Sequence, residues 1–589
     1  MGAMSSKIIR GLGALSFAVA GATLPAVTAA AGPAPWTWAR VVVPVAIDPH
    51  GYYSVRAFCP GGFTAVTGGL SVPEYSEVYR NAEYRWDDGS GSSWFVALEN
   101  PSNSSGSASV VAECVQSAQL PPISYNFVDI TRGSDGNAEG SVSCPNAGEV
   151  VLTGGAGWNN VNSRRINHSG PTWSGDAWIA RGWNSVSGAK LTVEVYCVSP
   201  NDVPGFDRIE LDYGGNSYWK TSITCPQGKR ILNGGTERHF GYANTFASYP
   251  SITTWTATGY HATGSTYLRA WCVSAGTPTV EITGATPGPE GAVTAQTYAS
   301  FSFTGTDPAG YPNGFKCSLD GSPPVTCFSG VFFGGRSSGP HEFVVWNSTP
   351  DGRSSGLTTY HWTIDAVPPN VTVKPLYPVT LATSAVVQWV GSDQHSSIDR
   401  YQAAYWLAHA NGTSTSWTLP TAWSDLASTS VRTPALAQGD SICVSVRAYD
   451  LVENVSPWTA PTCSSRPLDD RALTASTGWT RATGSSDWLN TVTKTTAMDR
   501  TLTRANVHLN RVGVVATVCP NCGVVVVKVG STTIGQINLK ANAIHHKRVR
   551  LLPGFAPRTS TVTVKSASSG KPVKIDGLVV IQKRSDGPV

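Results

Sequence analysis

The stretch Ser143-Cys-Pro-Asn-Ala-Gly-Glu-Val-Val-Leu-Thr-Gly-Gly-Ala-Gly-Trp158 sets the pattern for the first half of the chain. The same order of residues occurs upstream as Phe58-Cys-Pro-Gly-Gly-Phe-Thr-Ala-Val-Thr-Gly-Gly69 and downstream as Thr224-Cys-Pro-Gln-Gly-Lys-Arg-Ile-Leu-Asn-Gly-Gly235. Each copy contains a cysteine, a turn with Pro or Gly, an apolar strand and a Gly-Gly break. We interpret the shared motif as scaffold and expect any specificity in the loops that follow it.

A second cysteine, at the end of an apolar strand, closes each copy, and a strand that begins with Trp94, Trp178 or Trp255 precedes it. We expect about four strands per repeat, over residues 40–120, 121–203 and 204–277, with a disulfide between the first and last strands. A bridge that closes a loop of about 50 residues contributes about 3–4 kcal/mol in the chain-entropy model. Separate small sandwiches and a three-fold prism both remain open.

The loops over residues 74–91, 159–175 and 237–253 differ between the repeats and are rich in aromatic residues. Rings exposed on loops stack on sugar rings, but the same rings can also close the ends of small cores. Both interpretations stay open. The candidate ligand-binding residues are Tyr84, Trp86, Trp173, Tyr242 and Tyr249.

Composition favours a multidomain all-β protein. The 589 residues exceed the size of a single core and include 60 Gly and 39 Pro, while only 14% are charged. Gly and Pro interrupt helices, and apolar positions at helical spacing are lacking. Short strands joined by turns are therefore expected throughout.

Residues 1–31 are predicted to be a cleaved signal peptide, with Lys7 and Arg10 before the apolar run Leu12–Val27 and small residues at Ala29–Ala31. No later apolar run is long enough to span a bilayer, so we expect a secreted protein that is not membrane-spanning. In that oxidising compartment the twelve cysteines are expected to form local disulfides. The predicted pairs are Cys59–Cys114, Cys144–Cys197, Cys225–Cys272, Cys317–Cys327, Cys443–Cys463 and Cys519–Cys522.

Three regions resemble modules of secreted bacterial proteins. The triplicated Cys-Pro-x-Gly…Gly-Gly…Trp…Cys unit is similar to repeats of unknown function in such proteins. Residues 278–366, with Cys317-Ser-Leu-Asp-Gly321 and Trp362-Thr-Ile-Asp365, resemble a bacterial Ig-like repeat. Residues 367–466, with Val387-Gln-Trp389, resemble fibronectin type III, although Ile442 stands near the usual strand tyrosine. The resemblances imply spacer or adhesion roles, and fold alone assigns no function.

Residues 471–589 are predicted to form a basic β-sandwich of jelly-roll type, which looks like the terminal domain of such modular proteins. They carry 17 Lys and Arg against four Asp and Glu, a net charge of +13, whereas the whole chain carries +4. This asymmetry favours a polyanion such as wall polymer, acidic polysaccharide, phospholipid or extracellular DNA; a solubilising surface is the alternative. The candidate anion-binding residues are His545, His546, Lys547, Arg548 and Arg550.

Some motifs suggest chemistry that their surroundings do not support. Cys519-Pro-Asn-Cys522 precedes a predicted strand rather than the helix of a redox site, and no second cysteine pair completes a zinc site. Gly335–Gly339 and Gly352–Gly356 match G-x-S-x-G without the following helix of a nucleophile elbow. Neighbours such as Asp87–Asp88 or Asp469–Asp470 point to opposite faces of a strand, although calcium in a turn stays open for either pair.

We therefore expect a secreted, non-enzymatic binding or adhesion protein at or near the bacterial surface. Its expected partner is a cell-wall or extracellular polysaccharide, another polyanion or a second surface protein. No catalytic residue, cofactor, metal ligand or intracellular nucleic acid is expected. The alternatives are an extracellular polysaccharide hydrolase with accessory β modules and a structural coat or matrix protein.

Overall fold

The computed structural model describes residues 33–73, 78–160, 164–215 and 217–588, and the predicted signal peptide lies outside them. These residues form strands joined by turns and short 3-10 segments, without an α-helix, so the all-β prediction is confirmed. Within the same ranges, no helix has the length and apolar character to cross a membrane.

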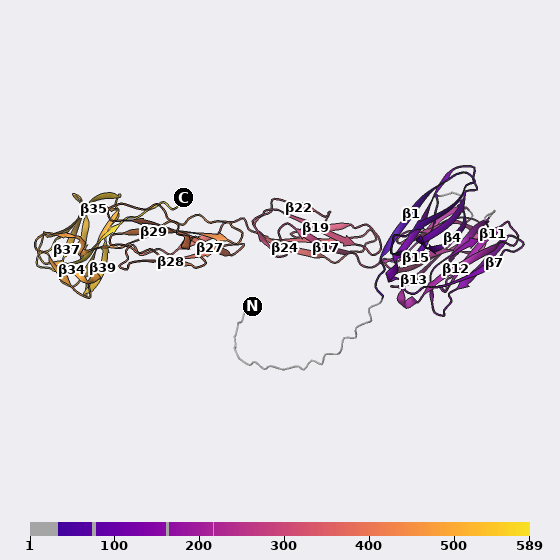
Figure 1. Cartoon of the computed structure of the whole chain (residues 1–589), viewed down its shortest axis with the longest axis horizontal. Coiled ribbons are helices and arrows are strands. Elements are labelled where there is room, and N and C mark those ends of the chain that lie inside the picture. The colour runs from indigo at the N-terminus through magenta and orange to yellow at the C-terminus, as the bar shows by residue number, and fades with distance from the viewer. Residues whose placement is uncertain (1–32, 74–77, 161–163, 216, 589) are drawn as a thin grey trace, which may run out of the picture. The chain divides into compact units, whose positions relative to one another are not determined.

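The chain divides into two compact units (Figure 1). The first runs to Val280 and includes residues 305–316 and 346–356; the second contains the rest.

The first unit holds the three repeats. The first two show six strands each in the described residues rather than four. One additional strand opens each repeat, β1 or β7, and the other, β4 or β10, lies in a segment expected to be a loop. In the third repeat, two long strands take the place of four. The elements are β1 (Trp38–Ile47), β2 (Tyr52–Phe58), β3 (Phe63–Ser71), β4 (Tyr79–Asp88), β5 (Gly91–Glu99), β6 (Gly106–Gln116), η1 (Ser117–Gln119), β7 (Ser124–Thr131), β8 (Asn137–Ser143), β9 (Val150–Trp158), β10 (Arg164–Pro171), β11 (Ala177–Asn184), β12 (Lys190–Val198), η2 (Pro200–Asp202), β13 (Asp207–Gly214), β14 (Tyr218–Thr224), β15 (Lys229–Pro250) and β16 (Thr254–Ser274).

Neighbouring repeats share sheets. One sheet, in the order β2-β5-β4-β9-β12-β7, joins three strands of the first repeat to three of the second. A second, β13-β16-β15-β10-β11-β8 with β14 paired to β16, joins the second repeat to the third. The third sheet is β1-β6-β3. The repeats therefore form one structure, which agrees with the prism alternative and not with separate sandwiches.

The Gly-Gly step of the motif allows two close contacts in every repeat. A Cβ on the first glycine would meet the indole of the same repeat's tryptophan. A Cβ on the second glycine would meet backbone of a different repeat, so only glycine lets these strands approach so closely. The contacts are Gly68–Trp94, Gly154–Trp178 and Gly234–Trp255 for the first glycine, and Gly69–Ser248, Gly155–Glu83 and Gly235–Ser169 for the second.

A shared apolar cluster joins the three repeats. Val66, Leu152 and Leu232 occupy equivalent positions and are fully buried in this cluster, together with the residue after each second cysteine. At each of the three positions the strand register skips one residue, which is the signature of a β-bulge. The bulge turns one extra apolar side chain away from its own sheet and into the common core.

All six predicted disulfides are present, and no free cysteine remains among the described residues. In each repeat the bridge joins the residue before the motif's turn to the last strand of the repeat, as predicted from the repeats and the strands that flank each cysteine. Disulfides in this number are typical of extracellular proteins.

The Ig-like region consists of two sheets, β17-β19-β22 and β18-β24-β23-β20-β21. Its core stacks Phe301 on Phe343 with ring centroids 4.2 Å apart, and Trp362 packs against Phe301. Its strands are β17 (Thr279–Ala285), β18 (Val293–Thr294), β19 (Ala299–Thr306), β20 (Phe315–Leu319), β21 (Val325–Thr326), β22 (Val331–Phe333), β23 (Gly339–Asn347) and β24 (Thr358–Ile364).

The fibronectin-like region pairs the sheets β25-β26-β28 and β27-β29-β30 around Val387, Trp389 and Tyr401. Ile442, the departure from the family pattern, is fully buried in the same core. The elements are β25 (Asn370–Val373), β26 (Val386–Ser392), β27 (Ile398–Ala408), η3 (Thr421–Trp423), β28 (Ser430–Arg432), β29 (Ser441–Asp450) and β30 (Thr462–Ser465).

The C-terminal region is a sandwich of the sheets β33-β34-β41-β36-β39, with β31 paired to β41, and β32-β35-β40-β37-β38. Valine, leucine and isoleucine side chains from both sheets fill the space between them. The elements are β31 (Leu468–Asp469), η4 (Asp470–Ala472), β32 (Thr474–Ala475), β33 (Thr480–Thr483), η5 (Trp488–Asn490), β34 (Thr491–Thr495), β35 (Thr501–Leu509), β36 (Arg511–Val518), β37 (Val524–Val529), β38 (Thr532–Asn538), β39 (His545–Leu551), β40 (Arg558–Ser566) and β41 (Val573–Ile581).

Candidate functional site

Three aromatic rings form a cluster on the sheet that the first and second repeats share. Tyr84 and Trp86 point the same way from β4, and their ring centroids lie 5.8 Å apart. Phe95 of β5, which is paired with Tyr84, contacts both rings at 5.0 and 5.4 Å. Trp86 stays 37% exposed, so the cluster presents a ring to solvent instead of closing a core.

Polar contacts hold Trp86 in place. The Arg56 guanidinium lies 4.5 Å from the Trp86 ring centroid and forms an ion pair with Asp88 at 2.6 Å. The Trp86 indole nitrogen donates to the same carboxylate at 2.9 Å. Hydrogen bonds from Ser90 and Arg56 hold the pKa of Asp88 below its usual range, so the acceptor stays ionised. The orientation of the ring is thus fixed by its neighbours before any ligand arrives.

A second aromatic cluster lies across the same sheet. Tyr125 and Phe127 of β7 are 48% and 56% exposed, and Tyr125 packs on Tyr196 of β12 with centroids 4.9 Å apart. The Arg85 guanidinium, from β4, lies 5.1 Å from the Tyr196 ring centroid. We call the six rings of the two clusters the aromatic face: Tyr84, Trp86, Phe95, Tyr125, Phe127 and Tyr196.

A pocket of about 300 Å³ lies between strands that carry the two clusters, and Tyr84 and Glu194 both line it. Gly157 of the central strand β9 contributes no side chain to its lining, and the side chain of its neighbour Ala156 is buried in the core of the second repeat. Thr192 and Asn159 add polar groups. The glycine-rich end of the motif therefore leaves space between two sets of rings, in addition to allowing the repeats to approach.

Glu194 is the carboxyl group among the residues that line this pocket. Burial raises its pKa to about 7, against a smaller opposing effect of the Tyr125 hydroxyl, which donates to Oε2 at 3.4 Å. Its Oε1 atom is buried without a hydrogen-bond partner in the described structure. Near neutral pH this side chain can both donate and accept a hydrogen bond.

Replacing Glu194 with glutamine should flatten the pH dependence of stability. The folded state binds more protons than the unfolded state between pH about 4.5 and about 7, so the free energy of unfolding falls as pH rises through that window. The loss amounts to about 3 kcal/mol, since each pKa unit corresponds to about 1.4 kcal/mol. Calorimetry of the full chain from pH 4 to 8 should show that the free energy of unfolding of the variant rises relative to that of the wild type as pH rises. Asp129→Asn, an exposed change on β7, is the control; parallel curves for Glu194→Gln and wild type would contradict the prediction.

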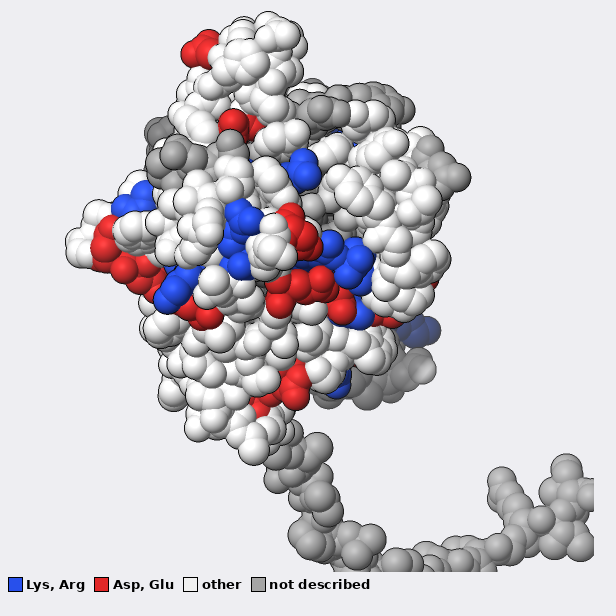
Figure 2. Space-filling model, turned by 90° about the vertical axis from the view of Figure 1, so that its right-hand side faces the viewer, with Lys and Arg blue, Asp and Glu red and all other residues white. Residues whose placement is uncertain are grey.

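The sheet shared by the second and third repeats has a different character. Arg181 and Arg238 both pair with Glu139, at 3.3 and 3.4 Å, and Arg269 pairs with Glu210 and Glu237. Figure 2 shows positive and negative side chains gathered in a mixed band on one face, with mostly uncharged surface around it. Charges of both signs that pair with each other do not form a binding surface for a polyanion.

The structure brings only some of the predicted ligand-binding residues together. Tyr84 and Trp86 are in contact, whereas Trp173, Tyr242 and Tyr249 show no ring contact with them in the described residues. Trp173 lies in the turn after β10 and Tyr242 lies within β15; both are more than half exposed, and Tyr249 is half-buried. Prediction from the variable loops did not include five residues of this surface, because they lie on the strands β5, β7 and β12: Phe95, Tyr125, Phe127, Tyr196 and Glu194. Alternation in Ser124–Thr131, with Tyr125 and Phe127 on one side, was the available signal.

The predicted anion-binding cluster lies on β39, an edge strand of the C-terminal sandwich. His545, Lys547 and Arg548 are exposed, Arg550 is half-buried, and His546 bonds to Asp487 at 2.9 Å. Positive charge on an edge strand also prevents pairing with other chains, so this position has a structural explanation as well.

The other motifs have ordinary partners. Cys519 and Cys522 form a disulfide followed by β37, as expected for a tight turn. Asp87 pairs with Arg85, and Asp88 with Arg56. Asp470 accepts hydrogen bonds from Thr491, Thr493 and Arg481, and Asp469 accepts from Thr491.

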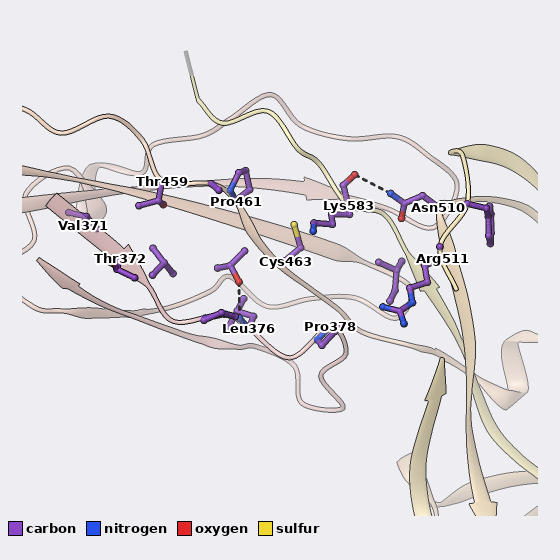
Figure 3. Close-up of a pocket in the computed structure, with 17 residues that line it drawn as sticks. Val371, Thr372, Leu376, Pro378, Thr459, Pro461, Cys463, Asn510, Arg511 and Lys583 are labelled. Atoms are coloured by element: carbon purple, nitrogen blue, oxygen red, sulfur yellow. Dashed lines mark hydrogen bonds between the residues drawn. The ribbon is translucent and has the colours of Figure 1, made fainter. Parts of the chain in front are cut away.

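A larger cavity, of about 970 Å³, lies within the second unit between the fibronectin-like region and the C-terminal sandwich. Figure 3 shows Thr372, Leu376, Pro461 and Cys463 on one side and Arg511 and Lys583 on the other. Two hydrogen bonds join lining residues to each other. Leu376 N donates to Thr462 Oγ1, and Asn510 Nδ2 donates to Lys583 O. Phe555 is the single aromatic residue among the seventeen described lining residues, so we interpret this cavity as a seam between regions.

No protein-family model matches the chain, and no curated protein matches it. Of the 147 chains in solved structures that match, two illustrate how distant the similarity is. One, "Structures of Clostridium thermocellum CbhA fibronectin(III)-like modules", is 16% identical with a TM-score of 0.17 and covers 32% of this chain and 95% of its own. The other, "Structural basis for the promiscuous specificity of the carbohydrate-binding modules from the beta-sandwich super family", is 10% identical with a TM-score of 0.15 and covers 52% and 100%. The all-β, multidomain architecture of the chain is shown by its own strands and sheets.

Proposed function

We propose that this protein is a secreted, non-enzymatic binding protein that recognises carbohydrate at or near the bacterial surface through the aromatic face. The observation that carries the proposal is the pair of exposed ring clusters beside the pocket that Tyr84 and Glu194 line. The C–H faces of sugar rings pack on aromatic rings, and a few polar groups then fix their orientation. Glu194, Thr192 and Asn159 supply those groups.

The remaining regions fit a carrier role in this proposal. The Ig-like and fibronectin-like regions act as spacers, and the six disulfides suit life outside the cell. The exposed part of the β39 cluster, with Lys547 and Arg548, makes an acidic polysaccharide the second ligand class.

Replacing Trp86 with alanine should weaken glycan binding about 5- to 150-fold. Loss of a central aromatic contact in an interface costs roughly 1–3 kcal/mol, and each 1.4 kcal/mol is a factor of ten. The measurement is a glycan array with neutral and acidic polysaccharides, followed by titration of the best ligand with the full chain. Trp173→Ala removes an exposed tryptophan outside the aromatic face and is the matched control.

Three results of this experiment separate the alternatives. An array without any signal contradicts carbohydrate recognition. Binding restricted to acidic polymers, lost in Lys547→Glu but kept in Trp86→Ala, would place recognition on the basic edge strand instead. An equal loss of glycan affinity in Trp86→Ala and Trp173→Ala would contradict recognition by the aromatic face.

A polysaccharide hydrolase is the second candidate, and the raised pKa of Glu194 is the observation that favours it. A general acid in glycoside hydrolysis needs such a carboxyl group in a pocket, together with a second carboxylate across the scissile bond. Release of reducing ends from wall polysaccharides that disappears in Glu194→Gln would support the hydrolase and overturn the non-enzymatic proposal.

A further inference from the structure

Three acidic side chains converge where the Ig-like region joins the fibronectin-like region. Asp365 follows β24, Asp393 follows β26 and Asp450 ends β29. One carboxylate oxygen of each lies within 4.8 Å of those of the other two. Asp365 and Asp450 are fully buried and Asp393 is half-buried. The three strand ends thus place three carboxylates around one point inside the second unit.

No positive side chain compensates this charge. In the described part of the chain, none of the three carboxylates forms an ion pair with Lys, Arg or His. Arg400, on the same region, pairs with Asp399 and Glu453 instead. Like charges at this separation repel strongly where water is excluded. Such a group needs protons or a cation to be stable.

Backbone hydrogen bonds orient the carboxylates and leave oxygens over. Asp365 Oδ1 accepts from Val367 N at 3.1 Å, and Asp393 Oδ1 accepts from His395 N at 2.8 Å. Asp450 is held by the backbone nitrogens of Val452 and Asn454, both at 2.9 Å. In contrast, Oδ2 of Asp365 and Oδ2 of Asp393 are buried, and no backbone N–H and no basic, amide or hydroxyl side chain of the described residues donates to them. The only described group within hydrogen-bonding reach of the Asp393 carboxyl on this side is the carboxyl of Asp365, so the pair has no donor unless one of them carries a proton. Buried polar atoms are normally paired, so two adjacent unpaired oxygens point to a missing ligand.

We propose that Asp365, Asp393 and Asp450 bind a calcium ion. Calcium takes oxygen ligands at about 2.3–2.6 Å, so two ligands on one ion lie at most about 5 Å apart. The separations found here satisfy that limit. The group offers no nitrogen or sulfur ligand of the kind that zinc prefers. Calcium takes six to eight oxygen ligands, so water and other oxygen atoms have to complete the coordination.

The position of the site gives the ion a mechanical role. Asn454 Nδ2 already donates to the Asp365 carbonyl at 2.9 Å and to Asp450 Oδ2 at 2.8 Å. A bound calcium ion adds a second link between the end of β24 and the ends of β26 and β29. The connecting residues 366–369 are thereby held at both ends, and calcium stiffens this joint.

Equilibrium dialysis of the EDTA-treated full chain against calcium chloride tests the proposal directly. We expect one more bound ion per wild-type chain than per Asp393→Asn chain, with half-saturation in the 0.1–1 mM range of extracellular calcium modules. Asp399→Asn, which removes an exposed carboxylate in the same region, should bind as much calcium as the wild type does. Equal binding by wild type and Asp393→Asn would overturn the assignment, as would equal affinity for magnesium.

Two further measurements, made on the wild type as well as on the variants, keep the test decisive when a variant folds poorly. Calcium should raise the Tm of the wild type and slow its proteolysis between residues 366 and 370, and neither effect should occur in Asp393→Asn or Asp365→Asn. In EDTA, Asp393→Asn should melt above the wild type, because it removes repulsion. The proposal would be contradicted if calcium changed neither the Tm nor the proteolysis of the wild type. It would also be contradicted if Asp393→Asn had a lower Tm than the wild type in EDTA.

Discussion

Replacing Glu113 with alanine is expected to lower the free energy of unfolding of the first unit by about 3–5 kcal/mol. Glu113 of β6 is fully buried and contacts two cations, Arg40 at 2.5 Å and Arg230 at 2.6 Å. Arg230 belongs to β15, so the pair connects the first repeat to the third. Its guanidinium lies 3.7 Å from the Trp38 ring centroid and is 1% exposed.

The cost arises from what the alanine leaves behind. Burial lowers the pKa of Arg230 to about 10, even though the charge of Glu113 acts in the opposite direction. Without Glu113, a buried guanidinium loses its anion while its contact with the Ala309 carbonyl remains. Removing one partner of a buried ion pair costs far more than the pair itself contributes.

Calorimetry of the full chain measures this effect as a lower Tm for one transition. The control is Asp207→Ala, which removes the half-exposed partner of Lys229 in the same unit and should cost less than about 1 kcal/mol. Similar shifts for the two variants would show that the Glu113 cluster is solvated in solution, contrary to the buried geometry.

The sequence predicted the local features of this fold well because they repeat at short range. Three copies of one cysteine-and-glycine pattern indicated three repeats, and the strand that ends at each second cysteine indicated the bridges. Sharing of sheets depends instead on pairs such as Ala82 with Gly157, which come from different repeats. No periodicity within one repeat reports that pairing.

The sequence predicted only part of the candidate site, because the rest depends on pairing between strands of different repeats. Tyr84 and Trp86 stood out as aromatic residues in a variable segment, but Phe127 and Tyr196 look like ordinary strand residues in the sequence. They become part of one surface only when β7 and β12 join the sheet of β4. Likewise, Asp365, Asp393 and Asp450 are far apart in sequence, and only the ends of β24, β26 and β29 bring them together.

Replacing Gly235 with alanine should disrupt the joint between the second and third repeats, at a cost of about 3 kcal/mol or more. A Cβ on this residue would run into the backbone of Ser169 and Gly170, on β10. Backbone cannot rotate away as a flexible side chain can, so one of the two strands has to move. That movement breaks the pairing of Ser169 with Thr236, which joins β10 to β15.

The matched control lies in the first copy of the same motif. Gly61 has open space around the position of its Cβ and an ordinary backbone conformation, so Gly61→Ala should be neutral. Thermal unfolding of the full chain and hydrogen exchange at β10 and β15 measure the difference. Loss of protection in Gly235→Ala should appear on both strands, although they belong to different repeats. A Gly235→Ala protein as stable and as protected as Gly61→Ala would mean that the repeats do not share a sheet at this point, because only that close crossing demands glycine at position 235.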